Sequence, residues 1–286
     1  MKNRDESSER SPANFEGRVP EFFDHQAATF ERRAGLPEIY CREIARAVIE
    51  IGEAGAGDLV VELGPGTGQI GRWFGAGVRY VGLDLSVGML REFRARLGDE
   101  QVERVLVRSD AQGNWPIADA SAHVVFSSRA IHLLDQEHVA REMFRVAARE
   151  GAMLIIGRVR REPQSMRARM AREMNERLRA RGFEGRGGER QNRKLFEACS
   201  RHGAKILEPV TVARWTVSTS PQVSLDSWRS LVSLGGINVP SKVRDEILTE
   251  LEGWARKEVG ALNREFESEE TYLLYPLRCV ATQGRT

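Results

Sequence analysis

The sequence predicts an α/β fold in which a doubly wound, mostly parallel sheet of seven strands carries a helical cap. Two observations predict it. Short apolar runs alternate with segments of helical period, which is the pattern of a parallel sheet with helices on both faces. Later in the chain this rhythm changes, and two further strand-like runs are separated by long helical segments. This change indicates a sheet edge into which helices have been inserted.

Five buried strands are expected in the first part of the chain. The apolar runs are "DLVVEL" (58–63), "VRYVGLD" (78–84), "ERVLVRSD" (103–110), "AHVVFSS" (122–128) and "AMLIIGRV" (152–159). Ser86 and Asp135 stand immediately before two helical patterns and are suitable N-caps for them. Strands that alternate with helices in this way predict parallel pairing with right-handed crossovers.

The domain organisation follows from these patterns. We expect a disordered tail over 1–14, a helical cap segment over 15–57, a core over 58–162, a helical insertion over 163–203, and edge strands over 204–286 that enclose a further helical insertion at about 221–265. The two N-terminal helices and the late insertions would together form the cap.

Composition excludes several classes of protein. Apolar residues make up 41% of the 286 residues, yet no apolar run approaches the ~18 residues of a membrane span. The first residues, "MKNRDESSERSPAN", contain no apolar segment, so we expect no secretory signal. Three cysteines without a C-x-x-C pair suit reduced thiols in the cytoplasm and argue against a disulfide framework or a zinc site. No metal site is predicted.

One short stretch, "ELGPGTGQIG" (62–71), satisfies two cofactor patterns. From Gly66 it spells G-x-G-x-x-G, the dinucleotide fingerprint, and from Glu62 it spells E-x-G-x-G-x-G. Asp84, which ends the second strand, would serve a ribose in either case. Glu62 distinguishes the two, because a carboxylate at this strand end would repel a pyrophosphate. It would favour the sulfonium and ammonium of S-adenosylmethionine (SAM), which carries no phosphate.

The whole constellation resembles the class I SAM-dependent methyltransferases, and within them the small-molecule branch that includes the ubiquinone and menaquinone methyltransferases. The resemblance is carried by "VVELGPGTGQIG", "YVGLDLSVGMLREFRARL" and "SDAQGNWPIADASAHVVFSSRAIHLL", which together cover about a third of the chain. It implies a Rossmann-like methyltransferase fold, SAM as the cofactor and S-adenosylhomocysteine as its product.

The resemblance also implies a role for each matched residue. The acid and the glycines of the loop hold the methionine moiety, the second-strand acid holds the ribose, and later residues surround the adenine. In this sequence these are Glu62, Gly64, Gly66 and Gly68 for methionine, Asp84 for the ribose, Leu85, Met89, Asp110 and Ala111 for the adenine, and Ser127 for the position that faces the methyl group. His123 departs from the family pattern, which has an acid just before the fourth strand.

Methyl transfer needs a base only when the acceptor must lose a proton. The candidates are His25, Tyr40, His132 and Tyr272. His132 follows the fourth strand, which by resemblance lines the substrate pocket, and packing under the sheet edge is an equal alternative. Arg129 is a candidate contact for an acidic substrate group. A surface arginine is the competing interpretation, which the arginine-rich composition favours.

A basic segment, 158–194, holds 13 basic side chains against five glutamates. It suggests nucleic-acid binding, but only five of the 43 basic residues in the chain are lysines, as expected of a GC-rich bacterial genome. We therefore favour a solvated helix face with Arg169–Glu173 and Arg172–Glu176 pairs. Met166, Met170, Met174 and Leu178 form an apolar stripe on the same helix, for which packing against the sheet is favoured over a substrate surface.

The sequence thus predicts a SAM-dependent methyltransferase that acts on an O, N or C atom of a small molecule in natural-product or quinone-like metabolism. An RNA methyltransferase that uses the basic segment, and a SAM-binding subunit without catalysis, remain the alternatives. The substrate, the acceptor atom and the oligomeric state cannot be read from the sequence.

Overall fold

The computed structural model describes residues 23–24, 27, 30–31, 35–75, 77–97, 104–148, 151–184, 188–231 and 233–280, without the side chains of 188–191. The tail expected over 1–14 and most of the first half of the segment expected over 15–57 lie outside these residues, and so does His25.

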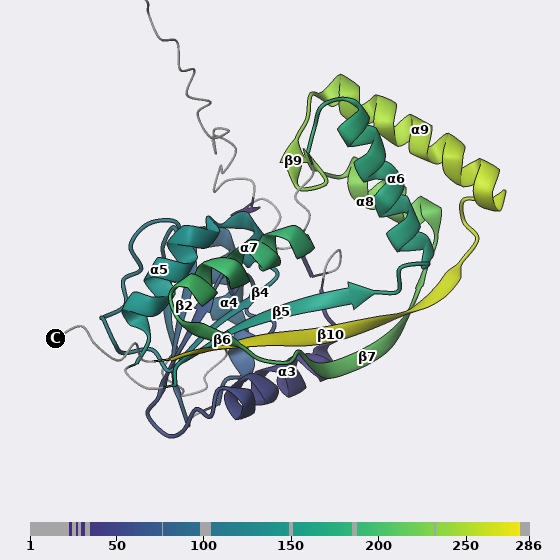
Figure 1. The fold of residues 1–286 in the computed structure, drawn as a ribbon. Helices are drawn as coiled ribbons and strands as arrows, with labels where there is room; N and C mark the ends of the chain where they lie inside the picture. Colours follow the sequence, from purple (N-terminus) through teal and green to yellow (C-terminus); the bar gives the residue numbers. More distant parts are fainter. Residues whose placement is uncertain are drawn as a thin grey trace, which may run out of the picture.

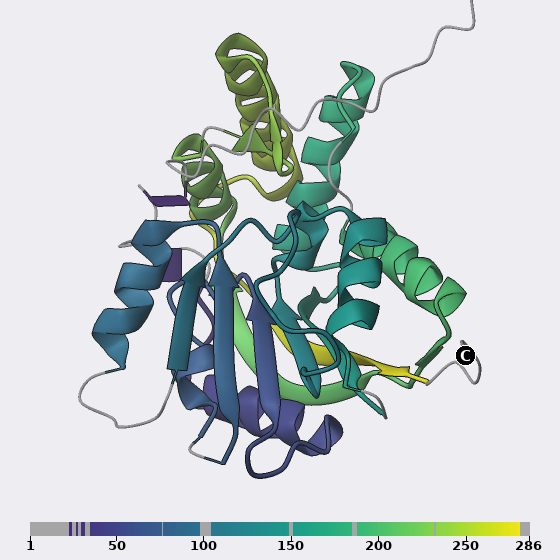
Figure 2. The ribbon, with the colours of Figure 1, turned by 90° about the vertical axis from the view of Figure 1, so that its left-hand side faces the viewer.

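A single mixed sheet forms the centre of the protein (Figures 1 and 2). Its strand order is β3-β2-β1-β4-β5-β10-β6, and β7 also pairs with β10. The strands are β1 (Leu59–Leu63), β2 (Arg79–Asp84), β3 (Arg104–Arg108), β4 (Val124–Ser128), β5 (Met153–Arg161), β6 (Ala204–Ile206), β7 (Val210–Thr219) and β10 (Phe266–Cys279). The first five strands pair in parallel, as their apolar runs predicted.

The sheet has seven strand positions, which confirms the predicted number. Both β6 and β7 pair antiparallel with β10, β6 along 277–279 and β7 along 266–274. They are therefore two consecutive parts of one edge strand. β10 itself lies between this edge and β5 and pairs antiparallel with both neighbours. The fold is thus the doubly wound α/β arrangement expected from the sequence.

Helices cover both faces of the sheet (Figure 2). On one face, α5 (Gln136–Val146) and α7 (Gly188–Arg201) bury residues such as Met143 and Leu195 in an apolar core with β1, β4 and β5. On the other face, α3 (Glu38–Ile51), the short 3-10 helix η2 (Gly71–Trp73) and α4 (Val87–Arg96) surround a second core. Such coverage explains why the parallel strands are almost continuously apolar.

Capping residues fix where the helices begin. The Ser86 hydroxyl accepts the Met89 amide at 3.1 Å at the start of α4, and the Asp135 carboxylate accepts the His138 amide at 2.7 Å at the start of α5. Both caps were predicted. Each satisfies an amide that the helix itself leaves without a partner.

The cap has a third apolar core of its own. The cap consists of α6 (Met166–Ala180), α8 (Pro221–Arg229), α9 (Ser241–Val259) and the small hairpin β8–β9 (Ser233–Leu234 and Ile237–Asn238). Figure 1 shows how β5, β7 and β10 run out from the sheet to carry it. The expected insertion over 163–203 therefore divides, because α6 lies in the cap while α7 packs on the sheet. The domain limits themselves stay a prediction.

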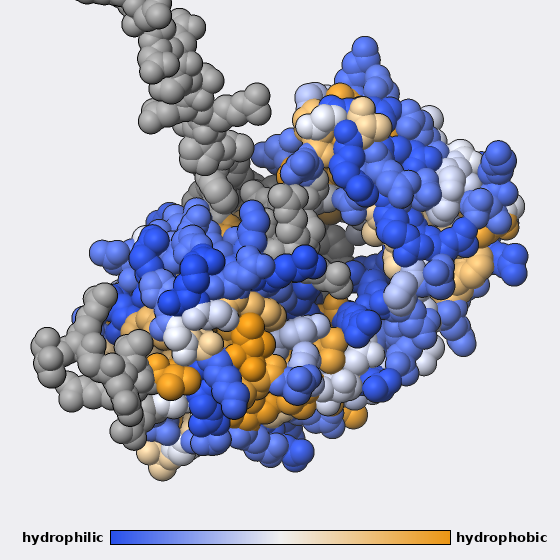
Figure 3. All heavy atoms as spheres, viewed as in Figure 1, coloured by the Kyte–Doolittle hydropathy of each residue, from blue (hydrophilic) through white to orange (hydrophobic). Residues whose placement is uncertain are grey.

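The methionine stripe of α6 is a packing surface. Met166, Met170, Met174 and Leu178 are all buried, and they contact α8 and α9 rather than the sheet. The expected packing partner was therefore wrong, although the packing role is borne out. The face of the cap seen in Figure 3 is correspondingly mostly hydrophilic. No helix in the described part of the chain has the length and apolar character to cross a membrane.

Candidate active site

The glycine loop connects β1 to η2 at the carboxyl edge of the parallel strands. Gly64, Gly66 and Gly68 all have positive φ angles, of 66°, 57° and 76°, which L side chains rarely adopt. A Cβ on Gly64 would lie 2.4 Å from the Ala130 Cβ, and one on Gly68 would lie 2.1 Å from the Phe93 ring. These two glycines are thus required by close packing.

Gly66 differs from the other two glycines because its missing side chain faces open space. The nearest atom to an added Cβ would be the Met89 sulfur at 4.0 Å. The loop therefore leaves room above Gly66 beside Met89, which the resemblance assigned to the adenine. A side chain at position 66 would occupy this space, so the glycine there fits a loop that a cofactor approaches closely.

Asp84 holds the loop from the neighbouring strand end. Its two carboxylate oxygens accept the Gly66 and Ser86 amides, each at 2.9 Å. Burial raises the pKa of this carboxyl, although the hydrogen bonds from the backbone oppose the shift. Asp84 is therefore placed directly against the glycine loop, as expected for the residue that would bind a ribose.

Glu62 lies beneath the same loop and is completely enclosed. The Tyr80 hydroxyl donates a hydrogen bond of 2.6 Å to its Oε2 atom, and a Cβ on Gly71 would lie 2.6 Å from that oxygen. Burial raises the pKa of Glu62 to about 7, and the negative charge of Asp84 acts in the same direction. Two neighbouring carboxyl groups make this site favourable for a cation and unfavourable for a pyrophosphate.

Arg129 follows β4 and reaches toward this loop. It has a positive φ of 62°, its Nη2 donates to the Gln69 Oε1 at 3.1 Å, and its guanidinium lies 5.8 Å from the centre of the Phe30 ring. Burial lowers its pKa. Arg129 is thus half-buried and held by contacts beside the loop, and its role toward a substrate stays a prediction.

The residues expected around the adenine lie on adjacent strand ends. Leu85 is half-buried directly after Asp84, and Met89 is buried in the first turn of α4. Asp110 is exposed after β3, and its Oδ1 accepts the Gln112 amide at 2.9 Å. Ala111 is buried, and its carbonyl accepts the indole N–H of Trp115 at 2.9 Å. Their roles toward a cofactor stay predictions.

The last residues of β4 and those that follow it differ in their surroundings. The Ser127 hydroxyl is buried within the sheet, where it donates to the Leu63 carbonyl at 2.9 Å. Its neighbour Ser128 instead contacts the Tyr272 hydroxyl at 2.7 Å. His132 lies in the 3-10 helix η3 (Ile131–Leu133) and is half-buried. The roles given to Ser127 and His132 stay predictions.

Two other candidate bases are held by aromatic or polar packing. The Tyr40 ring stacks on Trp215 with 5.6 Å between ring centres. Tyr272 is fully buried, and burial raises the pKa of its hydroxyl well above the usual range. The buried environment of Tyr272 therefore disfavours a base, because its hydroxyl would have to lose its proton near neutral pH.

The unusual His123 has a local partner at the opposite end of the sheet. Its Nδ1 accepts the Leu59 amide at 3.3 Å, which leaves Nε2 to donate to the Asp58 Oδ1 at 2.9 Å. A histidine paired with Asp58 therefore ties β4 to β1 at this position. The departure from the family pattern leaves the cofactor loop untouched.

Sequence reasoning missed two acids near the N-terminus that contact the site. Asp24 accepts the Gly88 amide at 2.7 Å and also the Ser86 hydroxyl, at the start of α4. Glu31 accepts the Thr67 hydroxyl at 2.5 Å and pairs with Arg96. No motif marks either residue, because both contacts join segments that are far apart in the sequence.

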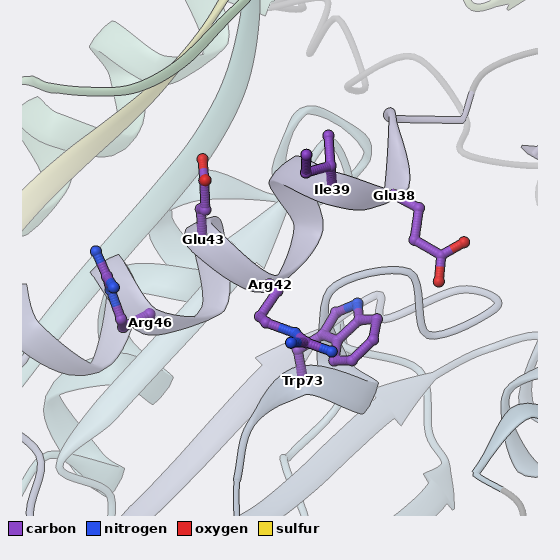
Figure 4. Close-up of a pocket in the computed structure, with 6 residues that line it drawn as sticks. All are labelled: Glu38, Ile39, Arg42, Glu43, Arg46 and Trp73. Carbon is purple, nitrogen blue, oxygen red and sulfur yellow. The ribbon is translucent and has the colours of Figure 1, made fainter.

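A surface hollow between α3 and η2 is lined by none of the predicted site residues (Figure 4). It is lined by one face of α3 and by Trp73, over which the Arg42 guanidinium lies 4.4 Å from the ring centre. We assign no role to this hollow.

Comparison with known proteins agrees with this geometry. A family described as a methyltransferase domain matches residues 61–155, which include the glycine loop, Asp84 and β4. No curated protein matches the chain. Because methyltransferases of this fold take their methyl group from SAM, the family match supports SAM as the cofactor of the loop.

Solved structures give the same result for the fold. Two proteins described as "putative" methyltransferases, from Bacillus halodurans and Anaeromyxobacter dehalogenans, are each 17% identical, with TM-scores of 0.53 and 0.52. The first match covers 82% of this chain and 98% of that one, and the second covers 84% and 96%. The YcgJ protein of Bacillus subtilis is 18% identical, with a TM-score of 0.52 and coverage of 82% and 97%.

The chain therefore has a Rossmann-like α/β fold similar to that of solved methyltransferase structures, and residues 61–155 of its core match a methyltransferase-domain family. These comparisons do not single out the ubiquinone and menaquinone branch, which stays a prediction.

Proposed function

We propose that this protein is a SAM-dependent methyltransferase that acts on a small molecule. The observation that carries the proposal is the pair of carboxyl groups around the glycine loop, the buried Glu62 below it and the half-buried Asp84 beside it, with open space above Gly66. When bound, SAM supplies an electrophilic methyl group on a positively charged sulfur. A negative, enclosed site stabilises that charge, and a dinucleotide would meet repulsion there.

We assign the following roles to the residues of the chain. Asp84 would hold the ribose hydroxyls, and Glu62 with the loop glycines would hold the methionine end. Alignment of donor and acceptor can itself supply about 7 kcal/mol or more of the acceleration. Arg129 would position the acceptor, and His132 would take a proton from it where the acceptor atom is protonated.

Charge pairing in the cap favours a small molecule over RNA. Arg169 pairs with Glu258, Arg177 with Glu173 and Glu250, and Arg181 with Glu250. These pairs differ from the Arg169–Glu173 and Arg172–Glu176 pairs expected from the helix spacing, and Arg172 instead donates to the Pro163 carbonyl at 2.5 Å. Arginines already neutralised by neighbouring carboxylates contribute little to phosphate binding.

We place the reaction in natural-product or quinone-like metabolism, since a cap with its own core can set substrate specificity apart from the cofactor loop. The decisive experiment incubates the protein with methyl-labelled SAM and a metabolite extract, followed by mass spectrometry. We expect label in at least one small compound. Label in added RNA, or SAM binding without any transfer, would instead support one of the two alternatives.

A further inference from the structure

An unbalanced group of charges lies where the cap joins the sheet. The Glu270 Oε1 atom, at the start of β10, accepts a hydrogen bond of 2.8 Å from the Arg161 Nε at the end of β5. The same oxygen accepts one of 3.3 Å from the Arg167 Nη1 on the first turn of α6. Two guanidinium groups thus share one carboxylate oxygen. Arg167 belongs to the segment 158–194 for which a solvated helix face was expected, and it is partly exposed as well as paired with Glu270.

The positive charges of this group are accessible and its negative charge is not. The side chains of Arg161 and Arg167 are 42% and 37% exposed, whereas that of Glu270 is only 9% exposed. Two cations and one anion leave a net charge of +1. The surface presented to solvent is therefore that of two adjacent guanidinium groups, each with N–H donors beyond those that Glu270 uses.

Among the described residues, the other shared-carboxylate ion-pair groups of the cap are balanced. Arg177 and Arg181 share Glu250, but Arg177 also has Glu173. Arg229 and Arg256 likewise share Glu252, and Arg229 also contacts Asp226. An excess of cations around a single buried carboxylate is therefore a specific feature of the junction at Glu270. It is not explained by the general abundance of arginine.

This group of charges lies on the same face of the sheet as residues near the proposed reaction site. Arg161 pairs directly with Glu270, and Val159 pairs with Tyr272, so alternate residues of both strands lie on one face of the sheet. On that face, Tyr272 contacts Ser128 next to Arg129. Gly157 is the strand partner of Ser128. Arg161 lies four residues further along β5, a distance of about 13 Å from Gly157.

We propose that the acceptor substrate carries a carboxylate or phosphate group, which Arg161 and Arg167 bind at the junction of cap and sheet. This inference rests on the proposed methyltransferase function. A guanidinium fork binds either kind of oxyanion in bidentate fashion. The anionic group lies about 13 Å from the strand end that carries Arg129, so the substrate is extended, with its acidic group remote from the atom that is methylated.

The first test measures anion binding without any substrate. The full chain, saturated with S-adenosylhomocysteine, is titrated with inorganic phosphate and with succinate by calorimetry. We expect binding of at least one anion, weakened about tenfold or more in the variant R161Q/R167Q. The control R172Q changes an arginine on the same helix that donates to a backbone carbonyl, and it should bind like the native protein. Equal affinity in all three proteins would overturn the inference.

The second test needs no variant and separates this inference from the proposed function. A metabolite extract is divided by anion exchange, and each fraction is incubated with the native protein and methyl-labelled SAM. Label in a small compound of the anionic fraction supports the inference. Label only in neutral or cationic fractions overturns it while the methyltransferase proposal stands, and label that ribonuclease removes would show that the anion is RNA. If no fraction is labelled, the proposed function fails, and the anion titration alone decides whether the site exists.

Discussion

Tyr80 donates a 2.6 Å hydrogen bond to Glu62 in a place that solvent does not reach, directly below the glycine loop. The phenol partly compensates a carboxyl group that would otherwise be buried without a partner. It does not restore the usual acidity of Glu62, whose pKa stays raised, at about 7. The loop thus rests on an acid that changes its charge near neutral pH.

This pair predicts a specific dependence of stability on pH. The pKa of Glu62 is higher in the folded protein than in the unfolded chain, so the unfolded chain gives up its proton first. Folding stability therefore falls as the pH rises from the ordinary carboxyl range to about 7, by at most roughly 3 kcal/mol.

The variant Glu62→Gln removes this titration and keeps an oxygen that can accept from Tyr80. We expect its melting temperature to rise relative to the native protein as the pH increases to 7, and the difference to level off above that value. Melting curves across this range measure it. A difference that is constant with pH would contradict the raised pKa of Glu62.

Asp84 offers a direct test of the cofactor assignment. Asp84→Ala removes the acceptor for the proposed ribose contact, and SAM affinity should fall tenfold to a hundredfold, since a charged hydrogen-bond partner contributes about 1.5–3 kcal/mol. Calorimetry measures the loss, and Asp84→Asn keeps one oxygen acceptor as the control. Unchanged affinity in a folded Asp84→Ala protein would refute the assignment. So would tighter binding of NADH than of S-adenosylhomocysteine.

Two loop glycines form a matched pair for separating folding from binding. Gly68→Ala would force a methyl group to within 2.1 Å of the Phe93 ring, so we expect a large loss of stability. Gly66→Ala meets open space and should cost only about 1–2 kcal/mol for its positive φ, yet it should weaken SAM binding. Thermal melts and calorimetry on both variants measure these effects. Normal SAM affinity in Gly66→Ala would show that the space above Gly66 is not the cofactor site.

His132 is tested by the size of the rate loss. If the acceptor is a hydroxyl, His132→Ala should lower kcat by about 10²–10⁴-fold with SAM affinity unchanged, and the acidic limb of the pH–rate profile should disappear. If the acceptor is an amine, thiol or enolate, the loss should stay within about tenfold. His138→Ala, on the surface of α5, is the control. A native kcat in His132→Ala would leave this residue with a packing role.

The core of the fold could be predicted because each of its strands and helices has a signal in its own short stretch of sequence. Each parallel strand is a continuous apolar run, and Ser86 and Asp135 mark the helix starts that follow. The cofactor loop could be predicted for the same reason, since its acid and glycines are spaced along one short stretch. Position in a parallel sheet then brings Asp84 to Gly66 without further information.

The cap and the charges of the site could not be predicted in this way. The β8–β9 hairpin has two residues in each strand, too few to show a period of two. The stripe on α6 required an apolar partner, but the pattern could not indicate whether the partner was the sheet or α9. Glu270 lies more than 100 residues from both Arg161 and Arg167, and no spacing rule connects residues so far apart.

Within the described residues, the apolar core of the cap shares no buried residue with the two cores that flank the sheet. A change in volume inside the cap is therefore absorbed among α6, α8 and α9, and it does not displace the loop that ends β1. Mutations that alter which compound the protein accepts can consequently accumulate on one side of the molecule during evolution. The affinity for the methyl donor, determined on the other side, is under separate selection.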